Sequence, residues 1–172
     1  MSKIRQAVIS AGGKGTRLRP TTDSMPKVMI PISGTPLLEH HVLNFKKHGV
    51  TEFFFTLHYL PNVITNYFSD GSKWGVKINY FIEKEPLGSA GGIKYFEKQL
   101  DNFFFFLYGD TFSLVDYSKM AEAFFAKGGA IGMQRVKRTD DYADVDVAEM
   151  DKDGVFVKIH PKPHIEKHKN AY

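Results

Sequence analysis

The stretch AVISAGGKGTRL, residues 7–18, decides the fold of this chain. It begins with a short apolar run, which predicts a buried β-strand. Three glycines follow, at Gly12, Gly13 and Gly15. Glycine lets a backbone approach a ligand closely and turn its N–H groups outward, so the strand is predicted to end in an anion-binding loop.

Basic residues add positive charge near this loop, at Arg17, Arg19 and Lys27. A guanidinium binds two phosphate oxygens at once and a lysine adds a point charge, so the loop suits a triphosphate. Two other phosphate loops are excluded. A dinucleotide fingerprint would need a glycine at Leu18, and a Walker loop would need Ser or Thr directly after Lys14.

The same segment resembles the opening motif of the sugar-1-phosphate nucleotidylyltransferases, also called NDP-sugar pyrophosphorylases. That motif reads G-G-x-G-T-R-L-x-P and then P-K-x-M-x-P, and both parts are present, at residues 12–20 and 26–31. The resemblance implies catalytic roles for Arg17 and Lys27, which would hold the triphosphate. It also implies nucleotide-binding roles for Ala11, Gly12, Gly13, Gly15 and Thr16.

The reaction that this resemblance implies joins a nucleotide to a sugar. A sugar-1-phosphate oxygen attacks the α-phosphorus of a nucleoside triphosphate, and pyrophosphate leaves. The attacking phosphate has a second pKa of about 6, so it is already a dianion and needs no general base. The chemistry therefore calls for positioning and charge neutralisation. The expected partners are an NTP and a sugar-1-phosphate.

Residues 85–92, EPLGSAGG, are similar to the family motif P-L-G-T-A-G, which lines the nucleobase. An ordinary Pro-Gly loop that opens a helix would have the same composition. The motif is closest in style to those of mannose-1-phosphate and heptose-1-phosphate guanylyltransferases, which favours GTP, with a uridylyl- or thymidylyl-transferring member as the alternative. The implied base-binding residues are Leu87, Gly88, Ser89, Ala90 and Gly91.

Asp110 follows the apolar run at residues 103–108 and is the natural metal ligand. A carboxylate at a strand end that faces a triphosphate is a hard oxygen ligand for Mg²⁺. The alternative is an aspartate that only caps the turn at Thr111. The family resemblance favours the metal role, because these enzymes place a metal-binding aspartate after a strand at this point.

The resemblance weakens toward the end of the chain. Lys162 matches the lysine of the family's E-K-P, which contacts the sugar phosphate, but Pro161 stands where the glutamate is expected. A glycine expected near residues 142–147 is also missing. Family members continue further and carry a second metal-binding aspartate there. We therefore expect this chain to lack the C-terminal part of the domain, with Asp144 or Asp146 as the available substitutes.

Strands and helices alternate up to about residue 127, and strands alone follow. Hydrophobic patterns predict strands at residues 52–57, 77–82, 103–108 (buried on both faces), 130–135, 145–150 and 155–160, and an extended piece at 28–30. Helices are predicted at residues 36–47, 61–68, 93–100 and 117–126, the last capped by Asp116, and a hairpin turn at Asp153-Gly154. This order predicts one three-layer α/β/α domain over residues 1–172, Rossmann-like, with a mostly parallel sheet and a late antiparallel excursion.

In such a sheet the ligands bind beyond the carboxyl ends of the strands. The glycine loop follows the first strand, which is predicted to be central, and Asp110 follows another. Both are therefore expected to face the same crevice.

Composition narrows the classes of partner. The chain has a net charge of +4, and its basic residues are scattered, which favours a small anion over a nucleic acid. It has no cysteine, which excludes disulfides and thiolate metal sites. The longest apolar run is too short to cross a membrane and no signal peptide precedes the first strand, so we expect a cytoplasmic protein, with homo-oligomerisation left open.

Two functions remain after these exclusions. The first is an Mg²⁺-dependent enzyme, or the N-terminal part of one, that makes an NDP-sugar. The second is a non-catalytic nucleotide-binding domain. A third idea, a metal stripe at His160, His164 and His168, is disfavoured, because Pro161 and Pro163 prevent the helix that it needs.

Overall fold

The computed structural model describes residues 4–88, 90–128, 130–137 and 145–162. The chain divides into two compact units, Met1–Ala126 and Lys127–Tyr172. The first unit contains a parallel sheet and the second contains a β-hairpin. The prediction of one domain over residues 1–172 stays a prediction, because compactness alone does not define a domain.

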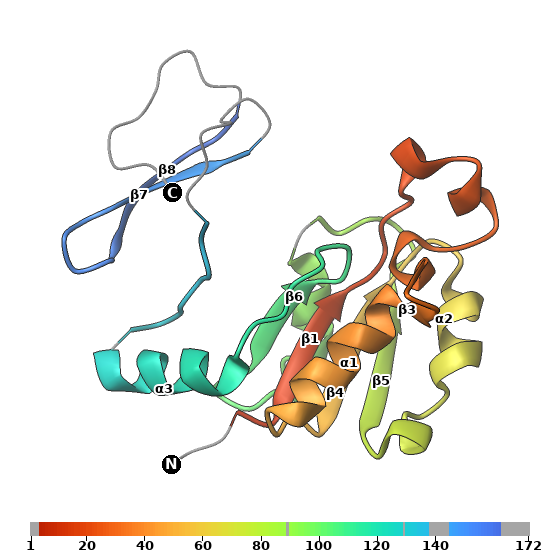
Figure 1. Cartoon of the computed structure of the whole chain (residues 1–172), viewed down its shortest axis with the longest axis horizontal. Coiled ribbons are helices and arrows are strands. Elements are labelled where there is room, and N and C mark those ends of the chain that lie inside the picture. The colour runs from red at the N-terminus through yellow and green to blue at the C-terminus, as the bar shows by residue number, and fades with distance from the viewer. Residues whose placement is uncertain (1–3, 89, 129, 138–144, 163–172) are drawn as a thin grey trace. The chain divides into compact units, whose positions relative to one another are not determined.

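The first unit is built on a four-stranded parallel sheet with the strand order β5-β4-β1-β6. Its strands are β1 (Gln6–Ser10), β4 (Glu52–Leu57), β5 (Lys77–Ile82) and β6 (Phe105–Tyr108). Because β1 pairs with both β4 and β6, its predicted central position is confirmed (Figure 1). All the strands run in the same direction, so the loops that follow them gather at one edge.

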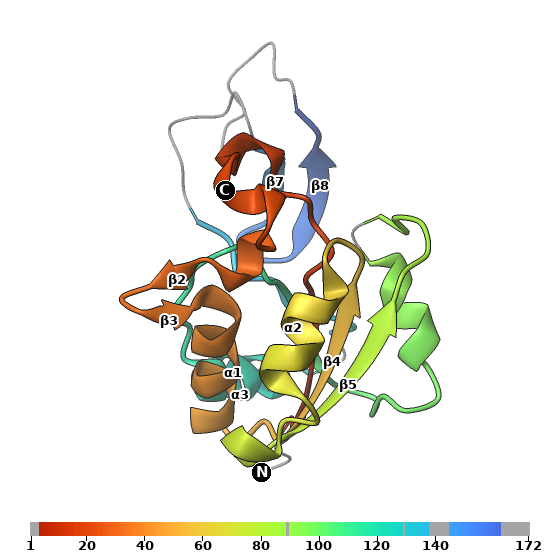
Figure 2. The same cartoon turned by 90° about the vertical axis from the view of Figure 1, so that its right-hand side faces the viewer.

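Three α-helices cover one face of the sheet: α1 (Leu37–Lys47), α2 (Pro61–Phe68) and α3 (Tyr117–Lys127). Successive residues of a strand point to opposite faces, so Ala7 and Ile9 join the core beneath these helices while Val8 turns away. Figure 2 shows α1 and α2 on one side of the strands and residues 91–96 on the other. The predicted α/β class with a mostly parallel sheet is confirmed.

The start of α3 follows the predicted capping pattern. The Lys119 N–H donates to the Asp116 carboxylate at 3.0 Å. That bond lowers the pKa of Asp116, and the nearby His48 and Lys119 charges add to the effect. A carboxylate in this position satisfies a backbone donor that the first turn of a helix leaves unpaired.

Of residues 28–30, predicted to be extended, Val28 and Met29 belong instead to the 3₁₀ helix Lys27–Met29, and only Ile30, which caps it, is extended. Pro26 and Pro31 enclose the segment and leave room for a single turn. The remaining short elements are β2 (Pro31–Ile32), β3 (Thr35–Pro36) and the 3₁₀ helices Thr16–Leu18, Thr21–Asp23 and Ser72–Trp74.

The helix predicted at residues 93–100 is confirmed only in part, because it begins earlier, ends earlier and is not α-helical. The chain forms a 3₁₀ helix at Gly91–Phe96 instead. Its two leading glycines disfavour an α-helix, and a Cβ on Gly92 would lie 2.5 Å from a Thr56 methyl carbon, so this end is pressed against β4. Phe96 packs against Phe54 and completes the small hydrophobic core on the face of the sheet opposite the α-helices.

Two strand predictions also need correction. Within the described residues β6 is an edge strand that pairs only with β1, and Tyr108 at its end is 46% exposed, so it is not buried on both faces. Residues 130–135 form no strand, and Ile131 is fully exposed. An apolar run becomes a strand only where a neighbouring strand takes up its backbone hydrogen bonds, and in the described part of the chain this segment has none.

The second unit contains the antiparallel pair β7 (Val147–Met150) and β8 (Phe156–His160). The Asp151 N–H donates to the Val155 carbonyl at 3.0 Å, and Gly154 has a φ of +76°, a conformation that glycine adopts without strain. The predicted hairpin turn is confirmed. None of the helices in the described ranges is long and apolar enough to cross a membrane.

Candidate functional site

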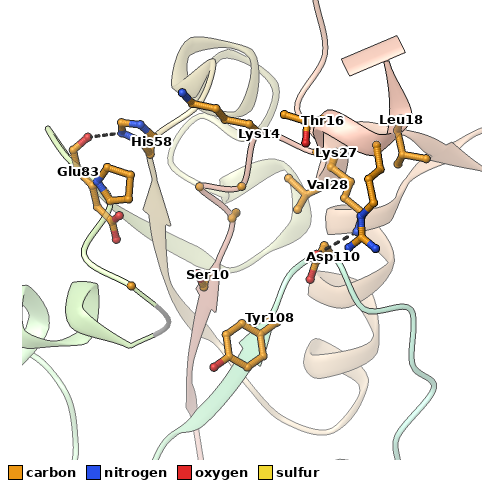
Figure 3. A pocket seen from close by; sticks show the side chains of 17 residues that line it. Ser10, Lys14, Thr16, Leu18, Lys27, Val28, His58, Glu83, Tyr108 and Asp110 are labelled. Carbon is orange, nitrogen blue, oxygen red and sulfur yellow. Dashed lines mark hydrogen bonds and ion pairs between the residues drawn. The ribbon is translucent and has the colours of Figure 1, made fainter. Parts of the chain in front are cut away.

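A pocket of about 560 Å³ lies at the carboxyl edge of the parallel sheet, in the first unit. Loops from every strand of the sheet contribute to it (Figure 3). Ser10 ends β1 and residues 11–18 follow it. His58 follows β4, the group Glu83, Pro86 and Gly88 follows β5, and Tyr108 and Asp110 come from the end of β6, while Lys27 and Val28 complete the wall.

Nine of the predicted site residues line this one pocket: Ala11, Gly12, Gly13, Gly15, Thr16, Arg17, Lys27, Gly88 and Asp110. The expectation that the glycine loop and Asp110 face a common crevice is therefore met. Leu87, Ala90 and Gly91 do not line the pocket, and Ser89 lies outside the described residues. The binding roles of all these residues stay predictions.

The glycine loop is held against its neighbours by close packing. The Ala11 N–H donates to the Thr56 carbonyl at 2.9 Å, and a Cβ on Gly12 would lie 3.1 Å from the Cβ of His58. Gly13 differs, because a Cβ there would meet no atom within 4 Å. This open side leaves space at the loop into which a ligand can come close to the backbone.

Gly15 closes the loop in a left-handed conformation, with a φ of +61°. A Cβ here would lie 3.0 Å from the Cβ of Lys27 and 3.1 Å from a Thr22 methyl carbon. The Thr22 hydroxyl donates to the Gly15 carbonyl at 3.0 Å. Glycine at this position therefore lets the stem of Lys27 pass close to the loop.

Arg17, Lys27 and Lys14 bring positive charge to the pocket. The Lys27 Nζ lies 3.0 Å from Asp110 Oδ2 (Figure 3). Arg19, which the sequence grouped with these cations, pairs with Asp23 at 3.1 Å and does not line the pocket.

Asp110 directly follows β6, and its side chain is half exposed toward the pocket. The alternative that it caps the turn at Thr111 is not supported, because the Thr111 N–H donates to the Tyr108 carbonyl at 3.2 Å. Mg²⁺ is commonly held by one or two carboxylates together with substrate phosphates and water. One carboxylate beside a phosphate-sized loop fits that kind of site. The described residues contain no cluster of three acidic, histidine or cysteine ligands.

The turn that carries Asp110 is held by hydrogen bonds from Gly109 to β1 and from α1 to Gly109. The Gly109 N–H donates to the Ser10 carbonyl at 2.8 Å, and the buried His41 donates its Nε2–H to the Gly109 carbonyl at 3.2 Å. Burial lowers the pKa of His41, and the Gly109 carbonyl and the Asp110 charge oppose this effect without cancelling it. A neutral imidazole thus supports the turn.

Glu83 and His58 are site residues that the sequence interpretation missed. Glu83 is a carboxylate with only 8% of its surface exposed, and Oε2 accepts the Leu87 N–H at 3.3 Å. His58 donates from Nδ1 to the Glu83 backbone carbonyl at 3.0 Å, which joins the ends of β4 and β5 (Figure 3). Their position in the sequence could have indicated them, because both residues directly follow a predicted strand, and Asp110 lies two residues after one.

Lys162, predicted to contact the sugar phosphate, belongs to the second unit. Its backbone N–H donates to Asp146 Oδ1 at 3.1 Å, so one of the two candidate substitutes for the second metal ligand contacts the backbone here. Asp144 lies outside the described residues, as do His164 and His168 of the disfavoured histidine stripe. His160 instead pairs with Glu149 across the hairpin at 3.2 Å.

Known proteins provide an independent comparison. The heptose relative, D-glycero-alpha-D-manno-heptose 1-phosphate guanylyltransferase of Campylobacter jejuni, is 39% identical over 85% of this chain and 65% of its own length. The mannose relative, mannose-1-phosphate guanylyltransferase of Mycobacterium tuberculosis, is 36% identical over 80% of this chain and 38% of its own length. This chain thus spans only part of both.

A solved structure gives the same result at the level of the fold. HddC from Yersinia pseudotuberculosis, complexed with GMP-PN, superposes with a TM-score of 0.71 at 27% identity, covering 98% of this chain and 72% of that one. Residues 6–172 match the family described as nucleotidyl transferase, which takes in every strand of the described sheet and the whole pocket. The chain belongs to the nucleotidyl transferase family.

Proposed function

We propose that this protein transfers the guanylyl group of GTP to a sugar-1-phosphate and releases pyrophosphate. The observation that carries the proposal is the convergence of the glycine loop, Arg17, Lys27 and Asp110 on one pocket. The heptose and mannose relatives are named for this kind of transfer, which supports it. Nucleoside triphosphates are cytoplasmic metabolites, so the proposal also places the reaction in the cytoplasm.

The chemistry needs two anions to be held together. An oxygen of the sugar phosphate forms a bond to the α-phosphorus, and the bond from that phosphorus to the bridging oxygen breaks, with the electron pair leaving on pyrophosphate. Because the attacking phosphate has a second pKa of about 6, no residue has to remove a proton. The protein therefore acts by holding the reactants in line and by neutralising their charge.

The residues of the pocket divide this work. The open backbone at Gly13 offers N–H donors to the phosphates, and Arg17 can bind two phosphate oxygens through its guanidinium. Lys27, whose stem packs beside Gly15, adds a point charge. Asp110 would hold Mg²⁺, which supplies charge neutralisation at the phosphate oxygens when it is bound.

Glu83 supports the choice of GTP. A buried carboxylate needs hydrogen-bond donors from whatever occupies the space beside it. The Watson–Crick edge of guanine presents two adjacent donors, N1–H and the N2 amino group. The Glu83 carboxylate can accept both in addition to the Leu87 N–H, because each of its oxygens can accept more than one hydrogen bond. Uracil places oxygen acceptors beside its N3–H donor, and adenine places the N1 acceptor beside its N6 amino group, so with either base an acceptor atom would face the carboxylate.

The decisive experiment measures pyrophosphate release by the full-length protein with each nucleoside triphosphate and a panel of sugar-1-phosphates. The panel begins with mannose-1-phosphate and D-glycero-alpha-D-manno-heptose 1-phosphate, the sugars in the relatives' names. We expect turnover with GTP and at least one of these. Asp110→Asn should lower kcat by about a hundredfold or more while leaving the protein folded, because it removes one charge from the metal position.

The matched control is Asp23→Asn, which removes the same charge at an exposed position outside the pocket lining and should leave kcat unchanged. Release that is indifferent to Asp110→Asn would show that the metal role is misplaced. No release with any sugar-1-phosphate, together with tight GTP binding, would instead support the non-catalytic nucleotide-binding domain.

A further inference from the structure

The Lys27–Asp110 ion pair joins two residues for which the proposed reaction has separate uses. Lys27 Nζ lies 3.0 Å from Asp110 Oδ2, across 83 positions of sequence. Both side chains line the pocket, Lys27 from the 3₁₀ helix Lys27–Met29 and Asp110 from the turn after β6 (Figure 3). Lys27, proposed to bind the triphosphate, is therefore paired with Asp110, the carboxylate proposed to bind the metal.

Both partners stand on backbone that is fixed from outside the pair. The Ile30 N–H donates to the Lys27 carbonyl at 3.2 Å, and the Lys27 stem passes close to Gly15. On the other side, the turn that carries Asp110 is held by the bonds from Gly109 to Ser10 and from His41 to Gly109. The architecture of the pocket, rather than the reach of one long side chain, brings the charges together.

This pairing sets the ammonium in competition with any divalent cation. A cation that approaches Asp110 in the absence of nucleotide must displace Lys27 from Oδ2 or bind beside a positive charge at close range. The pair is partly exposed, with 30% of the Lys27 side chain and 50% of the Asp110 side chain accessible. The competition is therefore modest in size.

A triphosphate changes the balance, because it offers Lys27 several anionic oxygens in place of one carboxylate oxygen. We propose that Lys27 occupies Asp110 until a nucleoside triphosphate draws it away, so that nucleotide and divalent cation bind this site with positive coupling. The proposal rests on the proposed function, since it takes the pocket to be the nucleotide site. Coupling of this kind is reciprocal, so the cation also strengthens nucleotide binding.

A purely structural ion pair makes a different prediction. If the pair only bridged the 3₁₀ helix and the turn, removing Lys27 would loosen both and weaken every ligand of the site. If Lys27 competes with the metal, the same change strengthens metal binding and weakens nucleotide binding. The two readings differ in sign.

The test uses Lys27→Met, which keeps most of the side-chain length and removes the charge. Mn²⁺, which like Mg²⁺ prefers carboxylate oxygens, is titrated into the nucleotide-free full-length protein and followed by electron paramagnetic resonance. We expect Lys27→Met to bind Mn²⁺ roughly two- to fivefold more tightly than the wild type. The titration is repeated with a saturating GTP analogue that cannot be cleaved between the α- and β-phosphates, and the signal of the free Mn²⁺–nucleotide complex is subtracted. Under these conditions Lys27→Met and the wild type should bind Mn²⁺ equally tightly.

Two control variants isolate the pair. Lys14→Met removes one positive charge from the same pocket, and Lys14 makes no ion pair with Asp110 in the described residues, so Mn²⁺ affinity should rise less than with Lys27→Met. Asp110→Asn, introduced into the wild type and into Lys27→Met, should abolish Mn²⁺ binding by the nucleotide-free protein in both cases. Thermal unfolding by circular dichroism checks that each variant is folded.

Mn²⁺ binding to nucleotide-free Lys27→Met that is unchanged or weaker than in the wild type would overturn the proposal, and so would no measurable binding in either protein. The proposed function would still be supported by pyrophosphate release from the wild type. An equal rise in Lys14→Met would overturn the proposal too, because the effect would then come from the general potential of the pocket. If no nucleoside triphosphate bound to the protein, both the proposed function and the proposed coupling would be overturned. The nucleotide-free titration would then report only on the ion pair between Lys27 and Asp110.

Discussion

The two glycine-containing loops that line the pocket are held in different ways. The first, residues 11–15, is tied to β4 by the Ala11–Thr56 hydrogen bond and packs around Gly12 and Gly15. The second, residues 83–88, is tied to β4 only at its first residue, where the Glu83 N–H donates to the Leu57 carbonyl at 2.7 Å and the Glu83 carbonyl accepts from His58. Beyond Glu83, the described residues of this loop show one hydrogen bond, from the Leu87 N–H to Glu83 at 3.3 Å, and a Cβ on Gly88 would meet no atom within 4 Å.

This difference matches the ligand group proposed for each loop. The triphosphate is the same in every nucleotide, so a fixed loop can present its donors at no reorganisation cost when the reaction occurs. The nucleobase varies, and a loop with few contacts can shift to admit or reject one. Discrimination then falls on the buried Glu83 rather than on the loop backbone. Substitutions in the two loops should therefore fail in different ways.

Among substitutions in the two loops, the largest effect should come from Glu83→Gln, and it should depend on the base. An amide offers one acceptor and one donor, so it satisfies only one guanine donor and turns its own donor toward the other. We expect kcat/KM for GTP to fall about thirtyfold, near 2 kcal/mol, while that for UTP stays level or rises. Pyrophosphate release with GTP, inosine triphosphate and UTP measures this, and the inosine nucleotide should lose less than GTP because it lacks the N2 amino group.

The control for Glu83→Gln is Glu85→Gln, the same change at an exposed position of the same segment. It should leave the ratio of GTP to UTP unchanged. An equal loss for GTP and UTP in Glu83→Gln would mean that Glu83 supports the loop instead of contacting the base.

Arg17→Ala should have a smaller effect that does not depend on the base. Removing a guanidinium that binds phosphate oxygens should weaken binding of GTP and UTP alike, each by about tenfold at low salt. The loss should shrink as ionic strength rises, because salt screens a charge at the mouth of a pocket. Calorimetry of both nucleotides at low and high salt measures this. Lys98→Ala, an exposed lysine outside the pocket lining, is the control, and a loss confined to one base would contradict the proposed division of roles.

The contrast between the loops also explains what the sequence could predict. The segments 52–57, 61–68 and 77–82 agree with β4, α2 and β5 residue for residue, because breakers such as Pro61 and the Asp70-Gly71 turn bound them locally. The glycine loop was predictable for the same reason, since its glycines and the basic residues after it lie close together in sequence. Arg19 shows the limit, because closeness in sequence to the loop does not reveal that it pairs with Asp23, four residues further on, and lies outside the pocket lining.

The rest depends on contacts between distant segments. Glu83 and His58 have no motif of their own, and they become site residues only because β4 and β5 are neighbours whose carboxyl ends meet. The buried strand expected at residues 103–108 is an edge strand in the described residues, since hydrophobicity does not reveal which neighbour is present. The run at residues 130–135 carries a strand-like pattern without the partner that would make it one.

The smallest expected difference compares Gly15→Ala with Gly88→Ala. Both glycines have positive φ values, +61° and +75°, so alanine pays a similar conformational cost at each, about 1 kcal/mol. At Gly88 nothing else is added, because the space around it is open. At Gly15 the new methyl group would press on Lys27 and Thr22 at 3.0 and 3.1 Å, which should add about 1 kcal/mol more. Urea unfolding of the two variants measures the difference. Equal losses of stability would mean that the phosphate loop yields as readily as the base loop, and the contrast between a fixed loop and an adaptable one would then have no energetic basis.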